Sequence, residues 1–191
     1  MVSYGMTPQE ALARLRDGNE RYLASARCIG DTSQAQREKT LSEGQHPYAV
    51  IVTCSDSRVI PEAIFSAGIG DLFVIRIAGN VMDGHQLGSI EYAAEHLGCG
   101  LVVVLGHTHC GAVDAAIHHE PEGYIKFITD EIVKAVGEET DEYRACRLNV
   151  LHSKAVIEES LLIQKDVREY GLKVTGAIYR LEDGTVEFFD E

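Results

Sequence analysis

The 191-residue sequence contains no tryptophan and only four prolines, and none of its apolar runs approaches the roughly 18 residues that a membrane-spanning helix requires. Basic residues are also scarce, because 17 Lys and Arg stand against 30 Asp and Glu, for a formal net charge of −13. Such a chain lacks the basic face that supplies most of the affinity for nucleic acid or an anionic membrane. We therefore expect neither nucleic acid nor a membrane as a partner.

The sequence also shows neither the pattern expected of a secretory signal nor that of a disulfide framework. The first residues do not form a basic segment followed by an apolar run, as a secretory signal does. The five cysteines are spread along the chain in no disulfide pattern, and no Cys-x-x-Cys pair is present, which disfavours a thiol redox protein. We expect a reduced, cytoplasmic setting in which the cysteines are metal ligands or core residues.

The length suits one domain rather than two. We expect a single domain over residues 1–191, with an N-terminal helical arm over residues 1–45 and an α/β core over residues 46–191. The arm begins with a helix, because Thr7 is followed three residues later by Glu10, the pattern of a capping box.

The core alternates between short apolar runs and helical stretches. The runs that predict strands are residues 48–53, 72–76, 101–105, 172–181 and 185–189. The length and apolar content of the first three runs are typical of strands buried on both faces, and Asp183-Gly184 predicts a hairpin between the last two. Helices are expected at residues 34–42, 61–67, 87–97, 111–118, 122–136 and 141–169. The predicted fold class is α/β: a mainly parallel central sheet, with four parallel strands plus an antiparallel edge strand, flanked by helices.

Potential metal ligands follow two of these strands. Cys54 comes directly after the first strand, and His107 and Cys110 follow the third. Ligands of open α/β sheets bind beyond the carboxyl ends of neighbouring strands, so these side chains are expected to converge. Two thiolates and one imidazole are good zinc ligands, and a catalytic zinc keeps a fourth position for water. Cys54 alone is more typical of a core cysteine, but the three residues together predict a zinc site.

The same stretch resembles the β-class carbonic anhydrases. That family is marked by Cys-x-Asp-x-Arg, here Cys54, Asp56 and Arg58, and by His-x-x-Cys about fifty residues later, here His107 and Cys110. The similarity extends over about residues 45–115. It implies a lyase that holds one Zn²⁺ per chain on Cys54, His107 and Cys110, and hydrates carbon dioxide reversibly to bicarbonate and a proton. Related enzymes are homodimers or dimers of dimers, which implies a homodimer or homotetramer here.

The resemblance also implies a catalytic dyad. Arg58 would hold the Asp56 carboxylate by a bidentate pair and keep it ionised. Asp56 would then orient the zinc-bound hydroxide toward carbon dioxide. Two thiolates cancel the formal charge of zinc, so this zinc is expected to acidify its water less than one held by three imidazoles.

Four further positions match the substrate pocket of the family. The resemblance implies that Gln45 and the backbone N–H of Gly111 hold substrate oxygens, while Phe73 and Tyr92 wall the pocket. Members that close the site by letting the aspartate bind zinc usually lack this glutamine, so an open zinc site is expected. The pocket residues are expected to lie near a subunit interface.

Two other functions remain open. The same scaffold could hydrolyse carbon disulfide or carbonyl sulfide, or the chain could be a non-catalytic, bicarbonate-responsive zinc protein. The presence of both Asp56 and Arg58 argues against a pure binding protein, which has no evident need for the dyad. The histidines considered for carrying the product proton to solvent are His85, His109, His118 and His119. Cysteines expected to have only a structural role are Cys28, Cys99 and Cys146.

Overall fold

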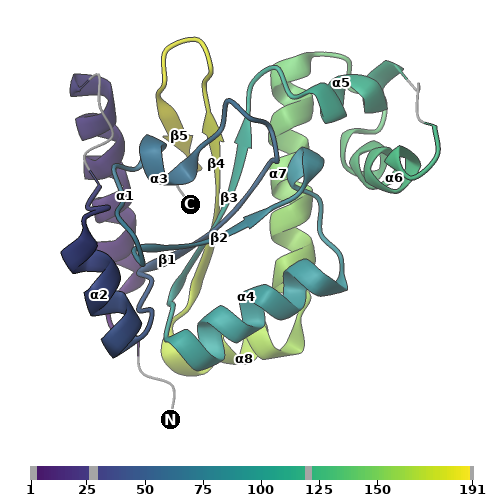
Figure 1. Ribbon diagram of the computed structural model, residues 1–191. Coiled ribbons are helices and arrows are strands. Elements are labelled where there is room, and N and C mark those ends of the chain that lie inside the picture. The colour runs from purple at the N-terminus through teal and green to yellow at the C-terminus, as the bar shows by residue number, and fades with distance from the viewer. Residues whose placement is uncertain (1–3, 26–29, 119–121, 190–191) are drawn as a thin grey trace.

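A computed structural model describes residues 4–25, 30–118 and 122–189 of the chain. A five-stranded sheet runs through its centre in the order β2-β1-β3-β4-β5 (Figure 1). The strands are β1 (Ala49–Thr53), β2 (Leu72–Arg76), β3 (Leu101–His107), β4 (Lys173–Tyr179) and β5 (Val186–Phe188). The first four strands are parallel and β5 is antiparallel to β4, which confirms the predicted α/β fold class and the edge hairpin.

Helices cover both faces of the sheet (Figure 1). They are α1 (Pro8–Ala24), α2 (Gln34–Glu43), α3 (Pro61–Ile64), α4 (Gly84–Leu97), α5 (Gly111–His118), α6 (Ile125–Val136), α7 (Glu142–Glu158) and α8 (Leu161–Tyr170), with a short 3₁₀ turn η1 (Ala78–Asn80). Among the described residues, no helix is both long and apolar enough to cross a lipid bilayer.

Two apolar cores lie on the two sides of the sheet, because successive side chains of a strand point to opposite faces. On β1, Val50 and Val52 face the core formed with α4, α5, α6 and α7. Ala49 and Ile51 face the smaller core formed with α1 and α3. Cys54 continues the first alternation and belongs to the larger core. The metal-ligand side chains are therefore expected on the side of the sheet that α5 and α7 cover.

The N-terminal segment has two helices that differ in burial. The predicted capping box is present: the Glu10 N–H donates to the Thr7 hydroxyl, and the Thr7 N–H donates to the Glu10 carboxylate. Helix α1 packs on the sheet of its own chain through Ala11 and Leu15, which are fully buried. Helix α2 buries no residue, and its Leu41 is 87 % exposed.

The prediction of a single helix over residues 141–169 is wrong, because the chain forms two helices there, α7 and α8. Ser160 adopts an extended conformation between them, and its hydroxyl accepts a hydrogen bond from the Ile163 N–H. A serine in this position caps a new helix instead of continuing the old one. The helix expected at residues 61–67 is shorter and ends at Ile64.

Candidate metal centre

The three predicted ligands meet at the carboxyl edge of the sheet. Cys54 follows β1, His107 is the last residue of the neighbouring β3, and Cys110 directly precedes α5. One ligand atom from each residue lies within 4.8 Å of the others. All three side chains are buried, with 4 %, 1 % and 2 % of the residue exposed. The parallel pairing of β1 with β3 thus places the Cys54 loop and the His107–Cys110 loop side by side.

The histidine presents a free nitrogen to this cluster. His107 Nδ1 lies 2.9 Å from the Thr108 carbonyl oxygen, and because a carbonyl only accepts hydrogen bonds, Nδ1 carries the proton. The lone pair of the neutral ring is then on Nε2, which is buried and has no hydrogen-bond partner among the described residues. A buried nitrogen without a partner is costly unless it binds something. Nε2 and the two sulfurs therefore fit a metal ion, as a zinc-type donor set does.

The two thiols of the cluster titrate as a pair. A hydrogen bond from Cys110 lowers the pKa of Cys54 to about 4, and the His107 ring and the Gly79 N–H act in the same direction. The same hydrogen bond, together with burial, raises the pKa of Cys110. The surroundings of Cys54 therefore favour its thiolate, the form in which cysteine binds metals.

Arg58 holds the Asp56 carboxylate beside the cluster. Arg58 Nε donates to Asp56 Oδ1 at 3.0 Å, and Arg58 Nη2 donates to Oδ2 at 2.8 Å, so the pair is bidentate. These hydrogen bonds lower the pKa of Asp56 to about 2. Arg58 Nη2 also donates to the His109 carbonyl oxygen at 3.0 Å, which links the Asp56 loop to the loop that carries His107 and Cys110.

Arg76, the last residue of β2, stabilises the loop that contains Cys54 and Asp56. Its Nε donates to the Cys54 carbonyl oxygen at 3.2 Å, and its Nη2 donates to the Asp56 carbonyl oxygen at 2.8 Å. The sequence analysis assigned no role to Arg76. No local pattern could have revealed one, because both of its partners are backbone atoms, 22 and 20 residues away in the chain.

The predicted substrate-pocket residues do not all come together within one chain. Gly111 begins α5 directly after Cys110, at the metal cluster. Gln45 precedes β1 and is exposed, so the whole length of β1, about 13 Å at the usual rise per residue, separates it from Cys54. Phe73 and Tyr92 lie beside each other, with ring centroids 6.3 Å apart, but Phe73 pairs in register with Val50, near the start of β1.

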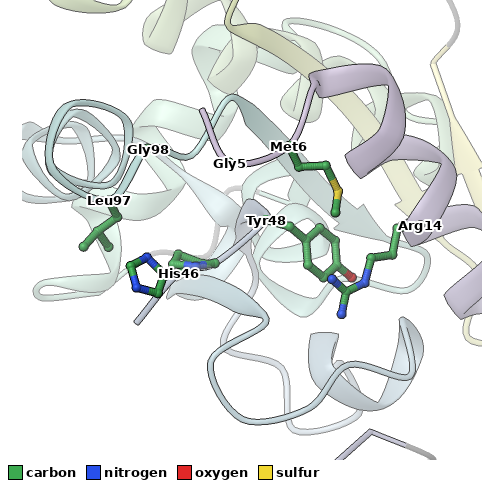
Figure 2. Close-up of a pocket in the computed structure, with 8 residues that line it drawn as sticks. Gly5, Met6, Arg14, His46, Tyr48, Leu97 and Gly98 are labelled. Atoms are coloured by element: carbon green, nitrogen blue, oxygen red, sulfur yellow. The ribbon is translucent and has the colours of Figure 1, made fainter. Parts of the chain in front are cut away.

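A separate pocket of about 260 Å³ opens at this amino-terminal end of β1 (Figure 2). Its lining comprises Gly5, Met6, Arg14, His46, Pro47, Tyr48, Leu97 and Gly98. The Arg14 guanidinium stacks 4.1 Å from the centroid of the Tyr48 ring and pairs with Asp71. None of these residues belongs to the metal cluster, which lies at the opposite end of the strand.

Of the four histidines considered for proton transfer, His109 lies closest in sequence to the cluster. Its ring bridges two carboxylates, with Nδ1 3.1 Å from Glu142 and Nε2 3.1 Å from Glu182. His85 and His118 have exposed side chains, and His119 lies outside the described residues. Cys99 and Cys146 are buried in the core as expected, whereas Cys28 lies outside the described residues.

Comparison with known proteins agrees with this geometry. A family model described as carbonic anhydrase matches residues 49–186. Carbonic anhydrase 2 of Mycobacterium tuberculosis is 37 % identical over 188 residues, which cover 93 % of this chain and 90 % of that protein. The carbonic anhydrase of Mycolicibacterium smegmatis is 35 % identical over 192 residues, 94 % of this chain and 92 % of that protein.

Solved structures show the same fold. The β-carbonic anhydrase CafA of Aspergillus fumigatus superimposes with a TM-score of 0.74 at 28 % identity, covering 95 % of this chain and 90 % of that one. A tetrameric β-carbonic anhydrase of Sordaria macrospora gives a TM-score of 0.74 at 25 % identity, covering 83 % of this chain and 88 % of that one. With its Cys-His-Cys cluster at the carboxyl edge of a mainly parallel sheet, the chain belongs to the β class of carbonic anhydrases, enzymes that interconvert carbon dioxide and bicarbonate.

Proposed function

We propose that this chain hydrates carbon dioxide reversibly with one zinc ion held by Cys54, His107 and Cys110, and with Asp56 and Arg58 as the catalytic dyad. The observation that carries the proposal is the convergence, within 4.8 Å, of two buried sulfurs and one imidazole nitrogen that has no hydrogen-bond partner among the described residues. Zinc is favoured because soft thiolates and a borderline imidazole suit it, whereas magnesium and calcium take oxygen ligands. Zinc, when bound there, would supply a Lewis acid that lowers the pKa of water, so that the nucleophile hydroxide forms near neutral pH.

Asp56 is the residue that orients the attacking oxygen. Its Oδ1 accepts hydrogen bonds from the Arg58 N–H and from Arg58 Nε, whereas among the described residues Oδ2 accepts only from Arg58 Nη2. Because a carboxylate oxygen has two lone pairs, Oδ2 retains one acceptor position. Oδ2 is also the oxygen that lies 3.9 Å from His107 Nε2, on the side of the cluster. The free lone pair of Oδ2 accepts a hydrogen bond from the attacking water or hydroxide. This hydrogen bond orients the attacking oxygen so that its own lone pair points toward carbon dioxide.

Arg58 keeps Asp56 available for this task. A pKa of about 2 leaves the carboxylate ionised at any pH at which the enzyme works. The bidentate pair also holds the carboxylate away from direct metal binding, which favours the open kind of zinc site. Both functions depend on the planar fork of arginine, which a lysine does not reproduce.

The substrate pocket is proposed to need a second subunit. Gln45, Phe73 and Tyr92 lie toward the amino-terminal half of β1, away from the cluster of their own chain. Strand β2 is an edge strand whose Leu72–Ile75 side chains are only half-buried. A copy that packs along this edge would bring its Gln45, Phe73 and Tyr92 to the cluster of the other chain. Gly111 is the first residue of α5 there, a position at which a helix leaves the backbone N–H without an intrahelical partner. The assembly is then a homodimer or a dimer of dimers, in keeping with the tetrameric Sordaria enzymes.

The first experiment is stopped-flow hydration of carbon dioxide by the zinc-loaded protein and by Asp56→Asn, at pH values from about 6.5 to 9 where an ordinary carboxylate is ionised. We expect a fast wild type whose rate rises with pH, and a variant that keeps its zinc but is slower by about 100-fold or more. Asp130→Asn is the control, because Asp130 is exposed and pairs with Lys126 on α6. A fully zinc-loaded wild type without activity at any pH contradicts the proposal. Assays with carbonyl sulfide and carbon disulfide would then test the other hydrolytic function.

A further inference from the structure

Helix α7 donates hydrogen bonds to the η1 turn from two buried side chains. Asn149 Nδ2 donates to the Gly79 carbonyl oxygen at 2.7 Å. One helical turn further on, the Ser153 hydroxyl donates to the Asn80 carbonyl oxygen at 2.9 Å. Both donor side chains are on residues that are only 1 % exposed. Two successive carbonyl groups of the turn are therefore held by donors that sit on one face of a rigid helix.

The residue held in this way contacts a metal ligand. The Gly79 N–H donates to Cys54 Sγ at 3.3 Å. Gly79 has φ +67°, and a Cβ there would lie 2.7 Å from Ile132 Cδ1 and 3.1 Å from Ala112 Cβ. A side chain at Gly79 would be strained by the left-handed backbone and would displace the tip of Ile132, so glycine suits this position. The direction of the Gly79 N–H depends on what fixes the turn. The hydrogen bonds from α7 do so at the Gly79 carbonyl itself.

Asn149 is a poor choice if stability alone is considered. Its Oδ1 is buried and has no hydrogen-bond partner among the residues that the structure describes. A buried polar group that remains unsatisfied destabilises the folded state, and an apolar side chain of similar volume would avoid this cost. What Asn149 provides is a single donor aimed at the residue that bonds to Cys54.

We propose that Asn149 is a positioning residue for the metal centre: it holds Gly79 so that the Gly79 N–H withdraws electron density from the Cys54 sulfur. This inference rests on the proposed function only in that the cluster binds a metal. Two thiolates neutralise the formal charge of a divalent metal, so each hydrogen bond to a sulfur restores some of its Lewis acidity. Ser153 supports the same turn one residue later and has a smaller effect.

The test uses Co²⁺ as a spectroscopic probe in the full-length protein. Thiolate-to-cobalt charge-transfer absorption reports the electron density on sulfur, and it moves to longer wavelength when a hydrogen bond to the sulfur is lost. We expect this shift in Asn149→Leu, with a smaller shift in the same direction in Ser153→Ala. We also expect Asn149→Leu to bind zinc about 10- to 100-fold more weakly, the usual cost of removing an outer partner of a metal ligand. The alkaline rise of its hydration rate should move to higher pH.

Asn19→Leu is the matched control. Asn19 is also buried, and its Nδ2 donates to the Ile64 and Gly184 carbonyl oxygens. Ile64 belongs to the smaller core, on the side of the sheet opposite to the core that contains Cys54 and Cys110. Asn19→Leu should destabilise the protein while leaving the cobalt spectrum unchanged. The inference is overturned if Asn149→Leu and Ser153→Ala keep the wild-type spectrum and zinc affinity, or if Asn19→Leu shifts the band equally. If Asn149→Leu does not fold, the smaller change Ser153→Ala decides. A wild type that binds no cobalt through sulfur would instead contradict the proposed metal site.

Discussion

Asp56 Oδ2 lies 3.9 Å from His107 Nε2, so the two atoms face the same small space. Within the part of the chain that the structure describes, the nitrogen makes no hydrogen bond and the carboxylate oxygen accepts one, from Arg58. The carboxylate is held from behind by Arg58 and the ring by the Thr108 carbonyl oxygen. A metal ion and the water it activates would lie between groups that are already oriented, which limits the reorganisation that the reaction requires.

Replacement of Arg58 should impair the reaction without neutralising Asp56. In Arg58→Met the pKa of Asp56 rises from about 2 toward the ordinary value near 4, so the carboxylate stays ionised at pH 7. The loss is then one of orientation, and we expect a rate about 10- to 100-fold lower, with only partial recovery in Arg58→Lys. Stopped-flow hydration at constant zinc content measures it. Arg147→Met is the control: it breaks the exposed pair with Glu187 and should keep the wild-type rate. If Arg58→Met also hydrates carbon dioxide at the wild-type rate, the role assigned to Arg58 is contradicted.

The cysteines should divide into ligands and core residues. Cys54→Ala and Cys110→Ala are expected to lose bound zinc, whereas Cys99→Ala retains one zinc per chain. Cys99 is fully buried, and burial raises the pKa of its thiol to about 12, so it is not a thiolate at neutral pH. Zinc content after dialysis against a weak chelator distinguishes the two groups. Because a metal that binds only the folded state stabilises it, zinc removal should also lower the Tm of the wild type but not of Cys54→Ala.

Mixing two inactive variants should restore activity if a second subunit supplies Gln45. In a dimer of one Cys54→Ala chain and one Gln45→Ala chain, one of the two sites receives an intact cluster and an intact glutamine. Random reassociation after mild unfolding would give about a quarter of the wild-type sites. Hydration rates before and after exchange test this. If mixing restores no activity, Gln45 either serves the cluster of its own chain or serves no cluster.

Asp166 should destabilise the folded protein at neutral pH. Its carboxyl is fully buried without a hydrogen-bond partner among the described residues, and burial, together with the charge of Glu95, raises its pKa. An acid with a raised folded pKa costs no stability below its unfolded pKa near 4, and costs more as the pH rises toward the folded pKa. Asp166→Asn should therefore increase the free energy of unfolding at pH 7, by about 1–3 kcal/mol, and by less at pH 5.

Urea denaturation at both pH values measures this difference. Asp130→Asn, at an exposed position on α6, should change the free energy of unfolding little at either pH. An Asp166→Asn variant less stable than the wild type at pH 7 would show that the carboxylate has a partner that stabilises it.

Much of the fold could be predicted because its signals are local. The capping box at Thr7 and Glu10 places the start of α1, and the apolar run at Leu72–Arg76 coincides with β2. The break at Ser160 was missed because the hydrophobic pattern of residues 141–169 continues across it. Cys54, His107 and Cys110 were identified because ligand-type residues follow two strands that a parallel sheet places side by side.

The sequence by itself determined the class of the protein, its strands and the three residues of the candidate metal cluster, since these depend on patterns within a few residues and on chemically distinctive side chains. Only the tertiary structure decided what surrounds them. It placed Gln45 at the end of β1 opposite Cys54, and it brought the Asn149 amide to Gly79 across 70 positions of the chain and the Gly79 N–H to Cys54 across 25. These contacts involve backbone atoms, which every residue has, so they cannot be predicted from the residue types in the sequence.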